Sequence, residues 1–454
     1  MLTTRQVVST APTDVDVLGI GFGPANIALA IALEDLGCSL DVRFLERRPR
    51  TRWQEGMLLE DSDIQNHPLR DLVTPRNPRS RYSFTNFLFE NGRLFEHLNL
   101  GLMFPLRVEY DQYIQWAAGF FSGQVEYGVE VASIEPLEHA GAGGVLQGYL
   151  VRDTTGRQWR ARALVVAPGR TPNIPELFRT GQGDSVVHLS GYLPALTRLQ
   201  GRVSQPRIAV VGGSQSAVEI LLHAHETLAD AVVVGITRNF GFRQKDTSPF
   251  SEEVYFPQFV QTFFHASPQN RQRLRRQLES TNYSAADKDV IERLYTRLYL
   301  ERVQHRQRLQ VLTNTQVDAV RTDDCGVELS FQHVLDGRPS TACFDLVVLA
   351  TGFLDIGTGP KREPYPALLA GLAPILDMSG GHLDVAIDYR VKFAGAWDRA
   401  NPLYLNGLCE STHGMGDSGS FSLLALRSGV IAESLVAALC PRQPLHTDDA
   451  HAGR

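Results

Sequence analysis

The chain has 454 residues, room for roughly two or three domains, and its 43% hydrophobic and 21% charged residues are ordinary for a globular protein. Its formal net charge of -6 gives no reason to expect a nucleic-acid or anionic membrane partner. No uncharged apolar run approaches the ~20 residues of a membrane span, and the first residues lack a signal-peptide core. We therefore predict a soluble cytoplasmic protein.

The first 46 residues have the pattern of a dinucleotide-binding unit. An apolar run from Val15 predicts a buried strand, and an Ala- and Leu-rich helix begins at Pro24. The turn between them contains Gly19, Gly21 and Gly23. Glycines let a phosphate approach the backbone, and the helix directs free N–H groups toward it. A second apolar run ends at Glu46, an acid placed to bind a ribose hydroxyl.

The next segment is irregular and then strand-like. Prolines break residues 47–82, and long irregular stretches in compact domains are usually functional. Helical periodicity returns over residues 83–89 and again over 110–121. Residues 125–166 alternate like the strands of a meander and run into Ala167-Pro-Gly169. This junction suits closure of the first nucleotide-binding domain.

A second strand–glycine–helix unit spans residues 207–222. The strand that follows it, over residues 231–238, ends in Arg238 where the first unit has an acid. An arginine at this place suits an adenosine 2′-phosphate, which indicates NADP rather than NAD. The alternative is an arginine that is simply solvated at the end of a strand.

The remaining residues complete a nested arrangement. Residues 245–305 have helical spacing and predict a small helical insertion. Strands return over 309–352 and end in Ala350-Thr-Gly352, the counterpart of the first junction, and a helix is predicted over 421–439. We predict an α/β fold of two nested Rossmann-like dinucleotide-binding domains with a small helical substrate insert. The predicted divisions are a first dinucleotide-binding domain over 1–200 and 346–440, a second over 201–345 that favours NADP, and a disordered tail over 441–454.

A series of short motifs runs along the chain over about residues 14–440. The most specific are Gly-Pro-Ala-Asn at 23–26 and Thr-Asn-Tyr-Ser at 281–284. The others begin at Asp16, Trp53, Asp71, Asn77, Gly212, Ser248, Ala350 and Thr412. Together and in this order they resemble the flavin-dependent N-hydroxylating monooxygenases, the L-ornithine and L-lysine N-monooxygenases of hydroxamate siderophore and related pathways.

The resemblance implies FAD on the first glycine turn and NADPH on the second. It implies that NADPH reduces the flavin, that O2 then forms a flavin C4a-hydroperoxide, and that an uncharged primary amine attacks this group. The cofactor carries the hard chemistry, so we predict no catalytic side chain. By resemblance the cofactor-binding residues are Gly19, Gly21, Gly23, Pro24, Glu46, Trp53 and Gln65 for FAD, and Gly213, Ser214, Gln215, Ser216 and Arg238 for NADPH.

The substrate positions depart from the family pattern. The family's lysine before Asp-Leu is Arg70 here, and its asparagine after Ser-Pro-Phe corresponds to Glu252, whereas Asn282 is retained. Arg70 can still bind a carboxylate, but Glu252 would repel one and attract an ammonium group. One interpretation is that both are neutral substitutions on a surface loop, with no role in substrate binding. Otherwise the substrate is a diamine, or a diamino acid of different length, rather than ornithine held in the usual way.

Two alternative functions would use the same two nucleotide sites. A related flavin monooxygenase could oxidise a sulfide or ketone, although Thr281-Asn-Tyr-Ser284 argues against this. A non-hydroxylating NADPH-dependent flavoprotein is the second rival. Neither a zinc site nor a disulfide framework is predicted, because the five cysteines form no CxxC pair and His67 and His413 lack ligand spacing. The family often forms tetramers, so a homotetramer is a further expectation.

Overall fold

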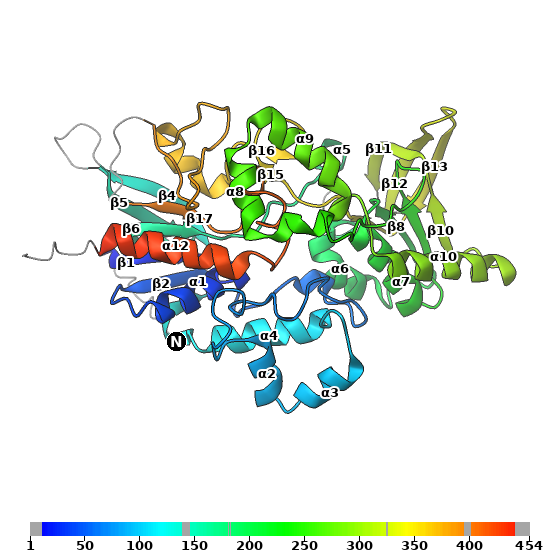
Figure 1. The fold of residues 1–454 in the computed structure, drawn as a ribbon. Coiled ribbons are helices and arrows are strands. Elements are labelled where there is room, and N and C mark those ends of the chain that lie inside the picture. The colour runs from blue at the N-terminus through cyan, green and yellow to red at the C-terminus, as the bar shows by residue number, and fades with distance from the viewer. Residues whose placement is uncertain are drawn as a thin grey trace, which may run out of the picture.

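The computed structural model describes residues 11–138, 146–179, 181, 183–323, 326–394 and 401–440. In this part of the chain the strands form four sheets. Figure 1 shows the two larger sheets toward opposite ends of the molecule, one built from both ends of the chain and the other from its middle. The predicted α/β fold class is therefore confirmed. The predicted tail over 441–454 lies outside the described residues.

The first sheet has strand order β3-β2-β1-β6-β5-β4, and β17 also pairs with β6. Its members are β1 (Thr13–Ile20), β2 (Val42–Glu46), β3 (Val125–Tyr127), β4 (Val131–Glu138), β5 (Leu146–Asp153), β6 (Gln158–Val166) and β17 (Leu403–Leu405). Only β4, β5 and β6 pair antiparallel. The predicted meander over 125–166 is thus wrong for β3, which pairs parallel with β2.

Helix α1 (Pro24–Asp35) is packed from several sides. Every residue from Asn26 to Leu33 is buried. The helix packs against α12 (Leu424–Leu439) and also contacts α4 (Arg107–Gly119). An apolar stripe on one face would not suffice for a helix in such surroundings, which explains its uniformly Ala- and Leu-rich sequence.

The second sheet is parallel throughout and has strand order β10-β9-β8-β14-β7. Its strands are β7 (Val186–His188), β8 (Arg207–Val211), β9 (Val232–Ile236), β10 (Leu309–Leu312) and β14 (Leu346–Leu349). One face packs against α7 (Gln215–Thr227) and α10 (Lys288–Val303). The other face is covered by a three-stranded sheet of β11 (Thr315–Asp323), β12 (Gly326–His333) and β13 (Pro339–Phe344).

Two segments cross between the sheets side by side. The first leaves β6 and the second leaves β14, and the Asn173 N–H donates to the Gly352 carbonyl at 2.9 Å. The Leu354 N–H donates to the Thr171 carbonyl at 2.8 Å. These are the two junctions that the sequence placed around the second nucleotide unit.

The middle of the helical stretch 245–305 lies between the large sheets (Figure 1). It contains α8 (Pro257–His265) and α9 (Pro268–Leu278), preceded by a 3-10 turn over Ser251–Tyr255. Val254 and Tyr255 of this turn pack on Met415, just after α11 (Glu410–His413). The last helix of the stretch, α10, packs on α7 instead.

The irregular segment before β3 carries three helices, α2 (Phe84–Glu90), α3 (Leu94–Leu100) and α4. Helices were predicted close to α2 and α4, and both are confirmed with shifted ends. No helix of the described residues has the length and apolar character needed to cross a membrane.

Candidate functional site

The first glycine turn joins the carboxyl end of β1 to α1. A Cβ at Gly19 would lie 2.2 Å from Phe44 Cδ1, and one at Gly21 would lie 2.4 Å from the Ala167 carbonyl oxygen. Gly21 also has a φ of +85°, which glycine adopts without strain. A Cβ at Gly23 would meet no heavy atom within 4 Å. The turn is therefore closely packed at its first two glycines and open at the third.

The amino end of α1 adjoins this open position. Gly23 is the N-cap residue, no side chain caps the helix, and Pro24 occupies the first turn. Backbone N–H groups and the helix dipole together favour an anion at such an end. Glu46 stands beside it, because its Oε2 accepts from the Phe22 N–H at 2.8 Å and its Oε1 from the Arg48 N–H at 3.0 Å.

Asn26 supports the same turn and had no role assigned from the sequence. It is buried, and its Nδ2 donates to the Gly21 carbonyl at 2.7 Å. Its Oδ1 accepts from Asn406 Nδ2 at 3.2 Å, and Asn406 in turn accepts from Arg427 at 2.8 Å. The signal was present as a single amide in an otherwise apolar helix, within the Gly-Pro-Ala-Asn motif.

Trp53 and Gln65 lie on the irregular segment that follows β2. The Trp53 ring meets Phe421 edge-on at a centroid distance of 5.2 Å and Tyr110 at 5.9 Å. Gln65 has a left-handed backbone, with φ of +51°, and its N–H donates to Asp63 Oδ1 at 2.8 Å. A non-glycine residue held in this region indicates a conformation imposed by its surroundings.

The second glycine turn joins β8 to α7. A Cβ at Gly212 would lie 2.4 Å from the Ala350 carbonyl oxygen, and one at Gly213 would lie 2.8 Å from Thr237 Oγ1. Ser214 is the N-cap residue of α7, and its side chain makes no capping hydrogen bond. This turn therefore also leaves the amino end of its helix free to bind an anion, next to Gln215 and Ser216.

Arg238 follows β9 by two residues and is exposed. The structure gives its guanidinium no ion-pair partner among the described residues. The other predicted NADPH residues follow β8, whereas Arg238 follows β9, the parallel strand next to it.

Asp287 links Gln65, predicted to bind FAD, with Gln215, predicted to bind NADPH, and was missed from the sequence. Gln65 Nε2 donates to Asp287 Oδ2, and the Asp287 N–H donates to Gln215 Oε1 at 2.8 Å. Gln215 Nε2 donates to Glu219 Oε1 at 3.0 Å, and Arg107 makes two bonds to the same carboxylate, at 3.0 and 3.1 Å. No sequence pattern identifies an aspartate that bridges distant segments, so the role of Asp287 is visible only in the folded structure.

The three predicted substrate residues gather around residues 419–422. Arg70 Nη1 donates to Ser422 Oγ at 3.2 Å and lies 3.9 Å from Glu252 Oε2. Asn282 lies close to Gly419, because a Cβ at Gly419 would be 3.0 Å from the Asn282 Nδ2. The two positions that depart from the family pattern therefore face each other as an ion pair. Ser422, which anchors Arg70, was not predicted.

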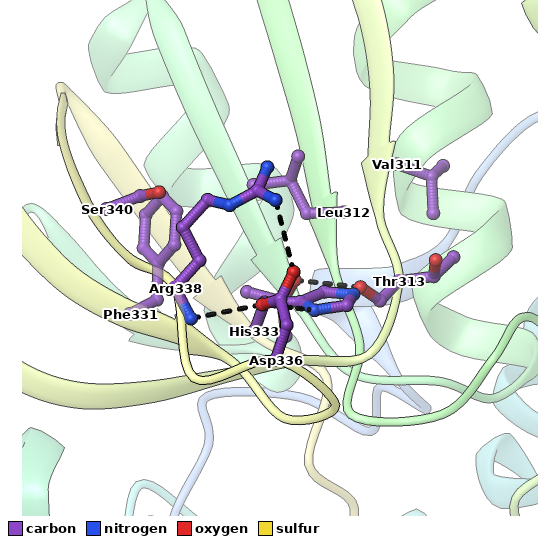
Figure 2. Close-up of a pocket in the computed structure, with 9 residues that line it drawn as sticks. Val311, Leu312, Thr313, Phe331, His333, Asp336, Arg338 and Ser340 are labelled. Atoms are coloured by element: carbon purple, nitrogen blue, oxygen red, sulfur yellow. Dashed lines mark hydrogen bonds and ion pairs between the residues drawn. The ribbon is translucent and has the colours of Figure 1, made fainter.

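The pocket of Figure 2 lies elsewhere, between the end of β10 and the hairpin of β12 and β13. His333 and Arg338 both pair with Asp336 there, at 2.8 and 3.2 Å. None of the residues predicted for a cofactor or substrate lines this pocket.

The two histidines weighed as metal ligands have other contacts. His413 is buried, stacks on Tyr389 at a centroid distance of 4.1 Å and shares a 2.8 Å hydrogen bond with Thr412. Burial lowers the pKa of His413 below its usual value. His67 Nδ1 accepts from the Leu69 N–H at 3.2 Å.

The geometry of both turns fits a dinucleotide. Each has glycines that bring the backbone close to a neighbouring strand, followed by a helix whose amino end no side chain caps. Glu46 provides an anchored acceptor at the first turn, and Arg238 provides an exposed cation near the second. This donor set suits two pyrophosphates, one ribose diol and one further phosphate.

Comparison with known proteins gives consistent matches. The family model described as L-lysine 6-monooxygenase/L-ornithine 5-monooxygenase matches residues 13–355. An L-ornithine N(5)-monooxygenase of Burkholderia cepacia is 38% identical over 413 residues, covering 88% of this chain and 90% of the relative.

Two solved structures are similar over nearly the whole chain. The ornithine N-hydroxylase of Kutzneria sp. 744, solved with reduced FAD, NADP+ and L-ornithine, has a TM-score of 0.84 and 34% identity, covering 93% of this chain and 99% of its own. The cadaverine monooxygenase of Erwinia amylovora, bound to FAD, has a TM-score of 0.79 and 25% identity, covering 97% of this chain and 100% of its own.

Proposed function

Because the chain belongs to the L-lysine 6-monooxygenase/L-ornithine 5-monooxygenase family, we propose that it N-hydroxylates the side-chain amine of an ornithine- or lysine-like amino acid, using NADPH, FAD and O2. The product would serve a siderophore or a related secondary metabolite. The observation that carries the proposal is the pair of glycine turns with uncapped helices, in a chain whose residues 13–355 match the model of this family.

FAD would be held by Gly19, Gly21, Gly23, Pro24 and Glu46, with Trp53 and Gln65 beside its ring system. NADPH would be held by Gly213, Ser214, Gln215, Ser216 and Arg238. When bound, the flavin accepts a hydride from NADPH and activates O2 for transfer to an amine. The corresponding FAD-binding domain would comprise residues 1–200 and 346–440, and the NADPH-binding domain residues 201–345.

The protein must shelter this chemistry from water. Trp53, Tyr110 and Phe421 form a set of edge-to-face rings, with centroids 4.9 Å apart for Tyr110 and Phe421. Tyr110 is fully buried. An alkylamine titrates near ~10.4 in water, and transfer into such apolar surroundings favours its neutral, nucleophilic form.

Arg70, Glu252 and Asn282 would hold the other end of the substrate. A zwitterionic α-amino acid matches the Arg70–Glu252 pair, because its carboxylate can bind the guanidinium while its α-ammonium binds the carboxylate. The ion pair is half-exposed, with side-chain exposures of 34% and 29%, so a substrate can insert between the two groups at a modest electrostatic cost.

A turnover panel tests the function. NADPH consumption and hydroxylated product are measured together for L-ornithine, L-lysine, shorter diamino acids, putrescine and cadaverine. The proposal requires product that matches NADPH consumption for at least one diamino acid. Steady peroxide release with every amine would show a non-hydroxylating NADPH-dependent flavoprotein instead.

A second candidate is hydroxylation of a diamine. It is favoured by Glu252, an anion where the family pattern has a neutral amide, and by the similarity to a cadaverine monooxygenase. Arg70 opposes it, because a guanidinium 3.9 Å from Glu252 repels a second ammonium group. Putrescine or cadaverine turned over with a lower KM than L-ornithine would establish the diamine.

Two variants separate the candidates. Arg70→Ala should raise the KM of an amino acid by about tenfold or more, because a charge-assisted hydrogen bond is lost, while the flavin stays bound. The same change should lower the KM of a diamine. Glu252→Asn should improve acceptance of Nα-acetyl-L-ornithine, which has no α-ammonium, relative to L-ornithine. Unchanged substrate profiles in both variants would show that Arg70 and Glu252 are neutral surface substitutions with no role in substrate binding.

We also propose that copies of this chain associate, with a homotetramer as the expected form. The support is an exposed apolar surface on α2, α3 and the loop after them, here called the α2–α3 surface, formed by Phe89, Phe95, Leu98, Leu100 and Met103. No residue of α3 is buried within the chain. Contiguous apolar patches of this kind mark interaction sites.

A further inference from the structure

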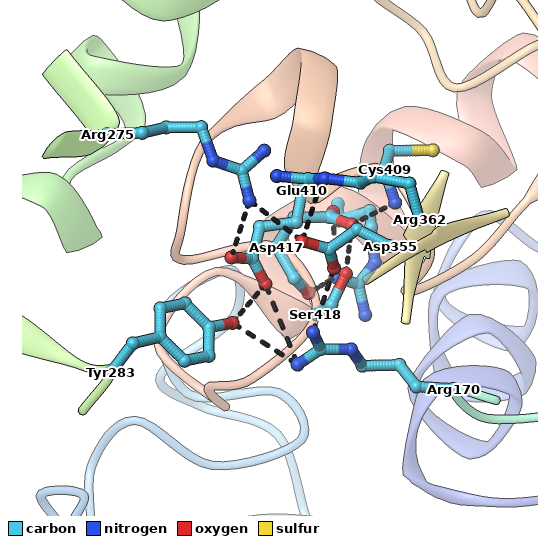
Figure 3. Close-up of polar contacts among 10 residues, drawn as sticks. Arg170, Arg275, Tyr283, Asp355, Arg362, Cys409, Glu410, Asp417 and Ser418 are labelled. Carbon is cyan, nitrogen blue, oxygen red and sulfur yellow. Dashed lines mark hydrogen bonds and ion pairs between the residues drawn. The ribbon is translucent and has the colours of Figure 1, made fainter. Parts of the chain in front are cut away.

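A cluster of buried charges lies where the two crossing segments, the helical insert and α11 meet (Figure 3). Its members come from segments far apart in the sequence, and the charged side chains among them are at most about one fifth exposed. They are Arg170, Arg275, Tyr283, Asp355, Arg362 and Glu410. None of them was assigned a role from the sequence or by the proposed function.

The Asp355 carboxylate binds all three arginines of the cluster. It accepts hydrogen bonds from Arg170 at 2.8 Å, from Arg275 at 2.7 Å and from Arg362 at 2.8 Å. These arginines come from the first crossing segment, from α9 and from β16 (Arg362–Glu363). Asp355 itself follows the second crossing segment, so this carboxylate ties both crossings to the insert.

Glu410 is the second anion and is completely buried. Its Oε2 accepts a 2.5 Å hydrogen bond from Tyr283 and lies 3.8 Å from Arg170, and its Oε1 lies 3.5 Å from Arg275. Oε1 has no hydrogen-bond partner among the described residues. A fully buried carboxylate with one unsatisfied oxygen is costly for the fold, so a structural role alone does not account for it well.

Tyr283 connects the cluster to the proposed substrate site. Its hydroxyl accepts from Arg170 at 3.2 Å while it donates to Glu410, so the position of the ring is fixed from two sides. The preceding residue is Asn282. A Cβ at Gly419 would lie 3.0 Å from Asn282 Nδ2 and 3.5 Å from Tyr283 Oη, so both polar tips border the same side-chain-free space.

We propose that Glu410 is a positioning residue for the amine substrate, which acts through its hydrogen bond from Tyr283 to fix the Asn282 amide against Gly419. The inference rests on the proposed function. The cluster would hold the insert on the loop of residues 414–422, whose Ser422 anchors Arg70. Loss of the bond would leave both cofactor sites intact and displace the substrate residues.

A pH effect follows from the same geometry. The groups that face Glu410 are Arg170 from the first crossing, Arg275 from α9, Tyr283 from the insert and Asp355 from β15 (Asp355–Ile356). Arg362 bonds the same Asp355 oxygen as Arg275. Burial, together with Asp355, raises the pKa of Glu410 to about 7. Protonation removes its attraction for Arg170 and Arg275, so the substrate KM should rise as pH falls through this region.

Tyr283→Phe and Glu410→Gln test the proposal in the full-length holoenzyme, with L-ornithine as the probe. Each should raise the KM of L-ornithine by about tenfold or more, the effect of losing a hydrogen bond to a charged group. The rate of flavin reduction by NADPH should stay unchanged. The double variant should be no worse than the more affected single variant, because both act through one bond. Glu410→Gln should also lose the rise in KM below pH 7.

Arg362→Gln is the matched control. It removes a charge that bonds Asp355 Oδ2 and makes no hydrogen bond to Tyr283 or Glu410, and should leave the KM of L-ornithine near that of the wild type. If Glu410→Gln does not fold, Tyr283→Phe, which removes one hydroxyl, still gives the answer. An unchanged KM in Tyr283→Phe, or an equal rise in the control, would overturn the proposal. Absence of coupled amine turnover in the wild type would instead reject the proposed function.

Discussion

Gly21 and Gly23 belong to one turn but tolerate different changes. Gly21 combines a positive φ with a close approach to the Ala167 carbonyl, so any side chain there strains the fold itself. Gly23 has an ordinary φ of -88°, and a Cβ there would meet no protein atom. The fold itself therefore does not require glycine at position 23, and its absent side chain leaves open space at the amino end of α1.

Gly23→Ala should weaken FAD binding without destabilising the apoprotein, because the added methyl occupies only the space proposed for the cofactor. Flavin fluorescence titration and the Tm of the apoprotein measure the two effects. Gly21→Ala is the contrasting control and should lower the apoprotein Tm. Unchanged FAD affinity in Gly23→Ala would argue against pyrophosphate at this turn.

Arg238 is exposed at the end of β9 and is available to an external anion. Arg238→Ala should raise the KM of NADPH by about 10- to 100-fold, as expected for loss of bonds to a phosphate, and leave that of NADH nearly unchanged. Steady-state kinetics with both nucleotides measure the ratio. Arg79→Ala, at another exposed arginine, serves as control, and an equal effect on NADH would rule out 2′-phosphate recognition.

Asp63 gives a pH dependence of stability. Burial raises its pKa to about 6, against a hydrogen bond from the Gln65 N–H that lowers it. The folded state thus binds the proton more tightly than the unfolded state does, and ionisation of Asp63 costs stability as pH rises through about 6.

Asp63→Asn keeps the acceptor for the Gln65 N–H but cannot ionise. The Tm of the variant, relative to the wild type, should therefore be higher at pH 8 than at pH 4. Thermal unfolding of the apoprotein across this range measures the difference. A Tm difference that stays constant with pH would show that Asp63 does not titrate in the expected direction.

At the scale of elements, helix α2 depends on its first residue. Ser83 Oγ accepts from the Asn86 N–H at 3.1 Å, and the helix is only 7 residues long, so one unsatisfied N–H matters. Ser83→Ala should cost about 1 kcal/mol of stability, the usual effect of removing such a cap. Denaturant unfolding of the apoprotein measures the loss. Ser83→Asp retains an acceptor and should restore most of the stability.

Helix α10 shows why composition alone did not settle the role of residues 245–305. Its sequence resembles the preceding helices in charge and spacing, yet Leu294 packs into the core of the second sheet. In contrast, Val254 near the start of the stretch packs on Met415 of the first unit. Periodicity predicts a helix, but not which surface the helix covers.

At the scale of the whole molecule, a buried ion pair joins the units built on the two large sheets. Arg107 of α4 binds Glu219 of α7 and the Met57 and Asp63 carbonyls. The side chains of the pair are 8% and 6% exposed. The contact holds α4 against α7, the helix that follows the second glycine turn.

Self-association is also a property of the whole molecule. The double variant Phe95→Lys/Leu98→Lys places charges on the α2–α3 surface, where both side chains are more than half exposed and contribute little to the folded monomer. We expect it to shift the oligomer toward smaller species in light scattering, with an unchanged monomer Tm. The control variant Leu335→Lys, at an exposed position away from this surface, should leave the oligomer size unchanged. A monomeric wild type would refute the homotetramer.

Much of the fold was predictable because its signals are local. The glycine turns, the helices that follow them and the strands that end at Glu46 and near Arg238 were all identified from short stretches of sequence, and the family comparison confirms the function class. Asn26, Asp287 and Ser422 were missed. Each is a common polar residue with a hydrogen-bond partner more than two hundred residues away, as with Asn26 and Asn406.

The sequence by itself determined the α/β class, the two glycine turns with the helices that follow them, and the family, because glycine spacing and hydrophobic periodicity are imposed by the backbone over a few residues. Only the tertiary structure decided that Arg70 faces Glu252, that Asp287 links Gln65 with Gln215, and that Glu410 is buried among arginines. Those pairings depend on how separate elements pack, and the free energy of burying a charge is set by neighbours that the chain brings together only when it folds.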